Sequence, residues 1–329
     1  FCLSSMDMET ILQWGLGLIR TVQGGANPAL TAFMKAVTNF GAAPAYMILL
    51  PLIYWCIDEK KGFRLGLAIM ASTWINLSLK FLCKQPRPFW PGWDPSVGMI
   101  KESLYGLPSG HAQISLTMWS IVASWFKKWQ AWVAAVLIIL LVGFSRIYLG
   151  VHFPTDLAAG WILGALVLAV YFLCTERFAA FLLKGGMRVQ FIVSAAAAFV
   201  MILYNPQAAR EIPNAVQSLI MPGGVVLGMG FGYSIAVNKL KFNAAAVFGR
   251  RGAAAFFTRA ARFLLGIAGV VLVFIIFSML RRLLGIEEGG GTYRLAVFLQ
   301  FACLELWIYA GAPWCFRRIR LAEGAAKKD

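Results

Sequence analysis

Two histidines, the only ones in the chain, lie at the ends of long apolar runs. His111 closes the segment Pro108-Ser109-Gly110-His111, and His152 is followed four residues later by Asp156. Beside a phosphoryl group, one imidazole can attack phosphorus while the other protonates the leaving oxygen. A neighbouring carboxylate can hold the attacking imidazole in the required tautomer. The pattern therefore predicts a pair of catalytic histidines assisted by Asp156.

Three cations stand at the same apolar boundaries, namely Lys80, Arg87 and Arg146. Cations gathered without an equal number of acids repel one another, so they predict a ligand with several negative charges. The guanidinium fork matches phosphate oxygens, and the ammonium group supplies a compact charge. Pro108 and Pro154 mark helix starts, whose free N–H groups also favour an anion. Since no set of carboxylates, cysteines and histidines in the sequence has metal-ligand spacing, we expect phosphoryl transfer without a metal or cofactor.

The elements that position these residues must be membrane helices. Of the 329 residues, 60% are hydrophobic and 13% are charged, whereas soluble domains are about 45–50% apolar and about 25% charged. A bilayer core requires about 20 apolar residues in a helix. Runs that meet or approach this length are 41–57, 62–83, 108–126, 131–151, 155–174, 189–204, 219–237, 263–280 and 295–316. The predicted fold is all-α, a polytopic transmembrane helical bundle with about nine spans.

The distribution of positive charge predicts the orientation of the bundle. The chain has 30 Lys and Arg against 14 Asp and Glu, a net charge of +16. These cations concentrate in alternate loops, in the basic stretch 239–262 and in the C-terminal tail. Because cytoplasmic loops carry the excess of Lys and Arg, we expect the C-terminus in the cytoplasm and the site outside. The expected location is a bacterial inner membrane, with lipid surfaces and no nucleic acid as the partner of the basic loops.

The order and spacing of the polar residues resemble those of a known family. Lys80-x6-Arg87-Pro88, Pro108-Ser109-Gly110-His111 and Ser145-Arg146-x5-His152-x3-Asp156 resemble the three signature motifs of the type-2 phosphatidic acid phosphatase (PAP2) superfamily. That superfamily includes lipid phosphate and polyprenyl pyrophosphate phosphatases, glucose-6-phosphatase and soluble vanadium haloperoxidases. The resemblance covers about residues 42–175 and implies a PAP2/haloperoxidase-like helical core.

The resemblance also implies a role for each matching residue. His152 would be the nucleophile that forms a phosphohistidine, Asp156 its orienting partner and His111 the general acid. The residues implied to bind the phosphoryl group are Lys80, Arg87, Ser109, Gly110 and Arg146. The expected substrates are phosphorylated lipids such as undecaprenyl pyrophosphate or phosphatidic acid. Two alternatives stay open: a phosphatase of a soluble phosphomonoester, similar to glucose-6-phosphatase, and a phospholipid or phosphate transporter.

Three segments are predicted along the chain. Residues 1–41 form an amphipathic interfacial segment, residues 42–175 the catalytic transmembrane core, and residues 176–329 an extension of four spans with a basic cytoplasmic loop and tail. Glycines spaced by four residues, such as Gly160 and Gly164, indicate close helix packing inside one bundle, with a homodimer interface as the alternative. The aromatic residues of loop 89–107 indicate an interfacial belt or, alternatively, a rim over the phosphate pocket.

Overall fold

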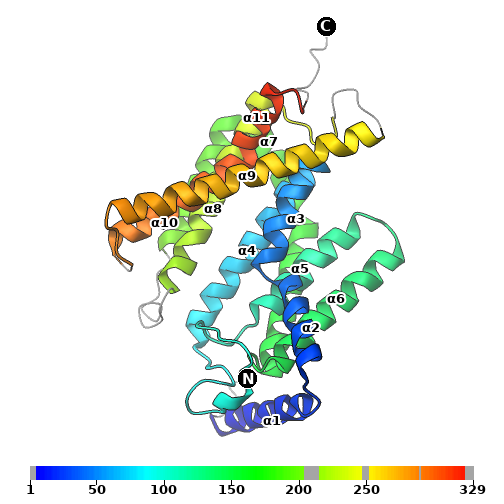
Figure 1. Ribbon diagram of the computed structural model, residues 1–329, viewed down its shortest axis with the longest axis vertical. Helices are drawn as coiled ribbons and strands as arrows, with labels where there is room; N and C mark the ends of the chain where they lie inside the picture. Colours follow the sequence, from blue (N-terminus) through cyan, green and yellow to red (C-terminus); the bar gives the residue numbers. More distant parts are fainter. Residues whose placement is uncertain (1–4, 204–214, 247–251, 289, 323–329) are drawn as a thin grey trace. The chain divides into compact units, whose positions relative to one another are not determined.

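The computed structural model describes residues 5–203, 215–246, 252–288 and 290–322. All secondary-structure elements of these residues are helices (Figure 1). The α-helices are α1 (Ser5–Gln23), α2 (Pro28–Thr38), α3 (Ala43–Cys56), α4 (Glu59–Cys83), α5 (Gly110–Ser124), α6 (Trp129–Tyr148), α7 (Pro154–Leu203), α8 (Ala215–Ile235), α9 (Ala253–Leu283), α10 (Gly291–Leu306) and α11 (Ala312–Arg318). Short helical turns are η1 (Asn39–Gly41), η2 (Pro95–Val97), η4 (Ala236–Leu240) and η5 (Trp307–Gly311). The predicted all-α fold is confirmed.

The predicted count of nine spans is not confirmed. Among the described residues, six helices are long and apolar enough to cross a membrane, and a seventh span results if α2 with η1 and α3, bent by 48°, are counted together. Two predicted spans, 155–174 and 189–204, lie on either side of Gly186, whose φ of 65° divides α7 into two helices; residue 204 lies outside the described residues. Another corresponds to α5, which has only 15 residues. Hydropathy locates apolar runs, but it does not show where a helix bends or stops short.

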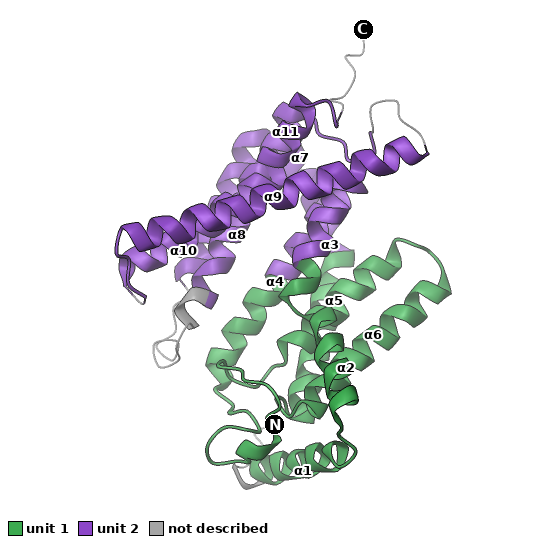
Figure 2. Ribbon diagram, viewed as in Figure 1, with its two compact units in different colours: residues 1–46, 71–172, 206–213 green, residues 47–70, 173–205, 214–329 purple. Residues whose placement is uncertain are grey.

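The chain divides into two compact units (Figure 2). Unit 1 comprises residues 1–46, 71–172 and 206–213, and unit 2 comprises residues 47–70, 173–205 and 214–329. Every predicted site residue belongs to unit 1. Residues 247–251 of the predicted basic loop and residues 323–329 of the tail lie outside the described residues.

Within unit 1, two glycines let α7 cross α5 at backbone contact distance. A Cβ atom added to Gly160 would lie 2.5 Å from the carbonyl oxygen of Ser109, and one added to Gly164 would lie 2.8 Å from that of Gln113. Both distances are shorter than carbon–oxygen contact allows, so only glycine fits. The pair therefore packs inside one chain, and it brings the start of α5 against the first turns of α7.

Within unit 2, a similar glycine seam joins α8 to α10 and η5. Cβ atoms on Gly224 and Gly228 would overlap the carbonyl oxygens of Phe298 and Ala302. One on Gly232 would lie 2.7 Å from the Cβ of Tyr309. Since three consecutive turns of α8 lack side chains on this face, the two backbones approach closely.

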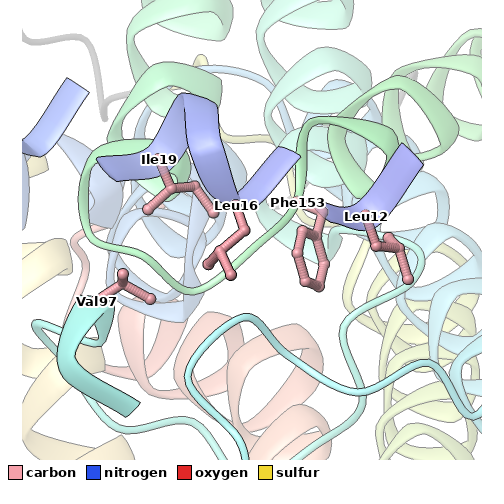
Figure 3. Packing of buried hydrophobic residues seen from close by; sticks show 5 residues of the cluster. All are labelled: Leu12, Leu16, Ile19, Val97 and Phe153. Carbon is pink, nitrogen blue, oxygen red and sulfur yellow. The ribbon is translucent and has the colours of Figure 1, made fainter. Parts of the chain in front are cut away.

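The N-terminal helix α1 supports the loop between α6 and α7. Its buried residues Leu12, Leu16 and Ile19 form one cluster with Val97 of η2 and Phe153 of the loop (Figure 3). Figure 3 shows the ring of Phe153 between the side chains of Leu12 and Leu16. Phe153 directly follows His152, so the amphipathic α1 buries its apolar face against the segment that carries a predicted catalytic residue.

Candidate active site

The imidazole of His152 is buried and held at both ring nitrogens. Its Nδ1 lies 3.0 Å from Oδ2 of Asp156, and its Nε2 lies 3.2 Å from Nη1 of Arg87. A guanidinium group can only donate, so Nε2 of the neutral ring accepts and the ring proton resides on Nδ1. That proton is donated to Asp156. The resulting tautomer places the lone pair on Nε2, where it accepts from Arg87, and Nε2 is the ring atom that can act as a nucleophile.

The charge state of His152 follows from its surroundings. The residue lies in the turn between α6 and α7 and is 1% exposed. Burial, followed by the positive charges of Arg87 and Lys80, lowers the pKa of His152 well below its ordinary value of 6.5. The ring is therefore neutral at neutral pH, as nucleophilic attack requires.

Asp156 lies in the first turn of α7, and its carboxylate is fully buried. Oδ2 also accepts from the backbone N–H of Phe153 at 3.0 Å, and Oδ1 accepts from Nε2 of Gln85 at 2.7 Å. The backbone N–H of Ser109 donates to the Asp156 carbonyl at 2.9 Å, which joins the start of α5 to the start of α7. Gln85 lies outside the three motifs, although it is only two residues before Arg87.

Arg87 connects His152 to the loop that precedes α5. Its guanidinium donates through Nε to the Leu104 carbonyl at 2.6 Å and through Nη1 to the Val151 carbonyl at 2.8 Å. Nη2 donates to Oε2 of Glu102 at 2.9 Å. Burial lowers the pKa of Arg87 to about 10, so the side chain remains charged at neutral pH.

Lys80, in the last turn of α4, binds the same loop. Its buried Nζ donates to the carbonyl oxygens of Tyr105 at 2.6 Å and of Gly106 at 2.9 Å. The backbone of loop 89–107 therefore contacts the ammonium group of Lys80 directly. This backbone placement is the one expected for a rim over the cationic residues.

Arg146, in the last turn of α6, completes the set of cations. Nη1 donates to Oγ1 of Thr38 at 2.7 Å, and Nη2 forms an ion pair with Oε1 of Glu102. Nε is buried and has no hydrogen-bond partner within the described part of the chain. A buried donor of this kind requires an acceptor, and it fits an oxygen of an anionic ligand.

Glu102 is the second residue of the site that lies outside the three motifs. Its two carboxylate oxygens bridge Arg87 and Arg146. Burial by itself would raise the pKa of Glu102, but the two guanidinium groups, together with His111, outweigh it and hold the value at about 2. A chemical signal for this residue was available: two buried arginines require a carboxylate, and loop 89–107 contains only Asp94 and Glu102 as acids.

The second predicted motif forms the N-terminus of α5. Ser109 is the N-cap residue, and its hydroxyl accepts from the backbone N–H of Ala112 at 3.5 Å. A Cβ on Gly110 would lie 3.0 Å from Oδ1 of Asn76, so α4 approaches the backbone closely there. His111 lies in the first turn of α5 and is partly exposed.

The assembled site combines the neutral imidazole of His152 with three neighbouring cations. Nε2 of His152 carries a lone pair, and the three cations that could stabilise a phosphoryl group are Lys80, Arg87 and Arg146. Within the described ranges, no group of three His, Cys, Asp or Glu side chains has the proximity needed to bind a metal. The arrangement can support attack on a tetrahedral, multiply charged anion.

Comparisons with known proteins point to one family. Residues 61–179 match the family model of the PAP2 superfamily, and residues 220–324 match that of the PAP2 superfamily phosphatase, transmembrane extension. An undecaprenyl-diphosphatase of Sulfolobus acidocaldarius is 31% identical over 161 residues, which cover 48% of this chain and 76% of that protein. Phosphatidylglycerophosphatase B of Bacillus subtilis is 29% identical over 154 residues, covering 43% and 72%.

A plant relative matches a longer part of this chain. Lipid phosphate phosphatase delta of Arabidopsis thaliana is 23% identical over 237 residues. The match covers 67% of this chain but only 56% of the plant protein. Together with the apolar helices, these similarities establish that the chain is an integral membrane protein and belongs to the PAP2 superfamily of phosphatases.

Proposed function

We propose that the protein hydrolyses lipid phosphates or lipid pyrophosphates without a metal, through a phosphohistidine on His152. The observation that carries this proposal is the pair of contacts at the His152 ring, 3.0 Å to Asp156 and 3.2 Å to Arg87. They assign the ring proton to Nδ1 and the lone pair to Nε2. An imidazole held in this way is prepared for attack, and the adjacent cations fit the charge of a phosphoryl group.

In the first step, Nε2 of His152 attacks phosphorus and forms a P–N bond. The P–O bond to the lipid breaks, and His111, protonated when the dianionic phosphoryl group is bound beside it, gives its proton to the departing oxygen. Asp156 stabilises the positive charge that develops on the phosphorylated imidazole. The products of this step are a lipid alcohol, or a lipid monophosphate from a pyrophosphate, and the phosphoenzyme.

In the second step, water attacks the phosphorus of the phosphohistidine. His111 accepts a proton from that water, the P–N bond breaks, and the electron pair returns to Nε2. Inorganic phosphate leaves, and both histidines regain their initial protonation states. The cycle thus consumes one water and requires no additional reactant.

A lipid substrate is supported by the relatives and by the surroundings of the site. The names of the similar proteins refer to undecaprenyl diphosphate, phosphatidylglycerophosphate and lipid phosphate. The site residues Lys80 and Arg146 lie in the last turns of apolar helices, so a phosphate bound there can remain attached to a tail in the bilayer. The bias of Lys and Arg toward the alternate loops favours an extracytoplasmic site.

The decisive experiment measures phosphate release by the purified protein in detergent with EDTA. The panel contains a polyprenyl pyrophosphate, phosphatidic acid, phosphatidylglycerol phosphate and a hexose 6-phosphate. His152→Ala is the inactive control, and Gln190→Ala, a buried change in unit 2, is the control for general damage. Wild-type protein incubated with a ³²P-labelled substrate and quenched with alkaline detergent should carry an acid-labile, base-stable label that the His152 variant lacks.

We expect release from at least one lipid in EDTA, lost in His152→Ala and kept in Gln190→Ala. Release from the hexose phosphate alone would overturn the lipid assignment and favour a soluble substrate. Loss of activity in EDTA with recovery in magnesium would overturn the metal-free reaction. Turnover without a labelled enzyme intermediate in a rapid quench would overturn the phosphohistidine.

A further inference from the structure

Glu102 occupies the two groups that a phosphoryl ligand needs most. One carboxylate oxygen binds Nη2 of Arg87, and the other binds Nη2 of Arg146. Both arginines are fully buried, with exposed fractions of 1% and 0%. A carboxylate that bridges two guanidinium groups reproduces the charge and the hydrogen-bond pattern of two phosphate oxygens.

The loop that carries Glu102 extends this occupation to the third cation. Arg87 binds the carbonyl of Leu104, and Lys80 binds the carbonyls of Tyr105 and Gly106. The segment 102–106 therefore provides an acceptor to each of the three cations that the motifs assign to the phosphoryl group. Nε of Arg146 is left without a hydrogen-bond partner among the described residues. The segment satisfies donors that would otherwise face a bound phosphate.

The side chain of Glu102 is also free to move away from the two arginines. This side chain is 25% exposed, in contrast to the arginines that it bridges. Glu102 lies outside regular helical structure, between η2 and α5. Its carboxylate can thus rotate toward water without a change in the helices, whereas the guanidinium groups are fixed by Val151 and Thr38.

We infer that Glu102 is an internal competitor of the phosphoryl group. Glu102 must release both Arg87 and Arg146 before the substrate can bind these two arginines. The inference deepens the proposed function and rests on its assignment of these arginines to the phosphoryl group. A competitor within the chain weakens the binding of every anion by the same factor, since each must displace it.

This competition also acts on the phospholipid headgroups at a membrane surface. Phospholipid headgroups are phosphodiesters with one negative charge on phosphorus, and they surround the site at high concentration. A phosphomonoester carries about −1.5 to −2 charges at neutral pH, so it binds a cationic site more strongly. Because Glu102 weakens the binding of both kinds of anion by the same factor, it lowers the occupancy of the site by diesters and leaves the preference for the monoester unchanged.

The test measures the binding of inorganic phosphate and of dimethyl phosphate, a soluble phosphodiester, to wild type and to Glu102→Gln. Calorimetry on the detergent-solubilised protein detects binding without turnover. Glu102→Gln keeps the shape of the side chain and removes its charge. Glu176→Gln is the matched control because Glu176 also pairs with an arginine, Arg64, but lies in unit 2.

We expect Glu102→Gln to lower the dissociation constants of both anions at least tenfold and by similar factors, and Glu176→Gln to leave them unchanged. Unchanged or weaker binding in Glu102→Gln would overturn the inference, because a carboxylate that only stabilises the arginines would give that result. If hydrolysis fails for every substrate but Glu102→Gln still binds phosphate more tightly, the proposed function fails and the competition stands. Hydrolysis without tighter binding gives the opposite outcome.

A second measurement uses the wild-type protein, in case the variant does not fold. Hydrogen–deuterium exchange is followed in the segment 98–107 with and without inorganic phosphate. We expect exchange in this segment to increase at saturating phosphate, because the anion displaces Glu102 and competes with the loop carbonyls for Lys80 and Arg87. Unchanged or reduced exchange at saturation would contradict the displacement.

Discussion

The side-chain amide of Gln85 donates to Oδ1 of Asp156 at 2.7 Å, across 71 residues of sequence. Oδ2 of the same carboxylate accepts from the ring of His152 and from the backbone N–H of Phe153. Gln85 therefore fixes the rotation of the carboxylate that orients the proposed nucleophile. Its 9% exposure excludes most of the water that could replace this hydrogen bond.

Replacing Gln85 by Met, which has similar length but no donor, should lower kcat about 10- to 100-fold, as for other residues that orient an active group. KM should change little, since Gln85 does not contact the predicted phosphate ligands. Steady-state hydrolysis of the preferred substrate measures both constants. Gln190→Met serves as the control for a buried glutamine, and an equal loss in that variant would indicate general destabilisation.

Replacing Asp156 by Asn should have a larger effect. An amide in place of the carboxylate no longer favours the proton on Nδ1 and no longer balances the charge of the phosphorylated ring. We expect kcat to fall by about 10³–10⁴, as for the equivalent change in a serine protease triad. A fall of less than tenfold would show that Asp156 does not orient His152.

The pH profile should report the charges around His152. Because its pKa lies well below 6.5, protonation of Nε2 should reduce kcat/KM only at a pH well below 6.5, and the neutral ring should persist above it. Arg87→Gln removes the largest charge that lowers this pKa, so the acidic limb should move upward toward 6.5. Comparing both proteins on one substrate cancels the ionisation of that substrate.

A matched arginine change provides the control for this pH experiment. Arg20→Gln removes an exposed guanidinium that pairs with Asp94, and the acidic limb should stay where it is in wild type. An acidic limb that does not move in Arg87→Gln would contradict the contribution of the Arg87 charge to the lowered pKa of His152.

The packing of α1 on the loop between α6 and α7, which carries His152, should couple stability to activity. Leu16 is 3% exposed and belongs to the cluster with Phe153. Truncation of a buried leucine to Ala costs about 2–5 kcal/mol, so Leu16→Ala should unfold at lower temperature and lower kcat by displacing the His152 turn. Trp14 lies on the same helix and is 61% exposed, so Trp14→Ala should retain both the unfolding temperature and kcat of wild type. Equal kcat in all three proteins would show that α1 does not position the turn.

The proposed orientation can be tested on either side of α5. Lys101 and Lys128 are both exposed, and they lie before and after this helix. In a cysteine-free background, an impermeant maleimide added to intact spheroplasts should label Lys101→Cys. It should label Lys128→Cys only after permeabilisation. The reverse pattern would place the site on the cytoplasmic side.

Some contacts of the candidate site could be predicted from the sequence, and others could not. His152 and Asp156 are four residues apart at a helix start, so local geometry alone predicts their contact. Glu102 and Gln85 lie in connecting segments, and no periodicity indicates where those segments run. Their roles depend on how α4, α6 and α7 bring distant backbone together. The count of nine spans is not confirmed, because the bend between α2 and α3 and the shortness of α5 leave no mark on hydropathy.

The position of the Glu102 carboxylate between Arg87 and Arg146 has a consequence for the design of inhibitors. Compounds that imitate a phosphate usually carry phosphonates, whose double charge hinders passage through membranes. The arginine pair Arg87 and Arg146 accepts a plain carboxylate from this protein's own loop. A carboxylic acid on a lipid-like tail, shaped to span the same two guanidinium groups, is therefore a rational scaffold for a drug directed at this site.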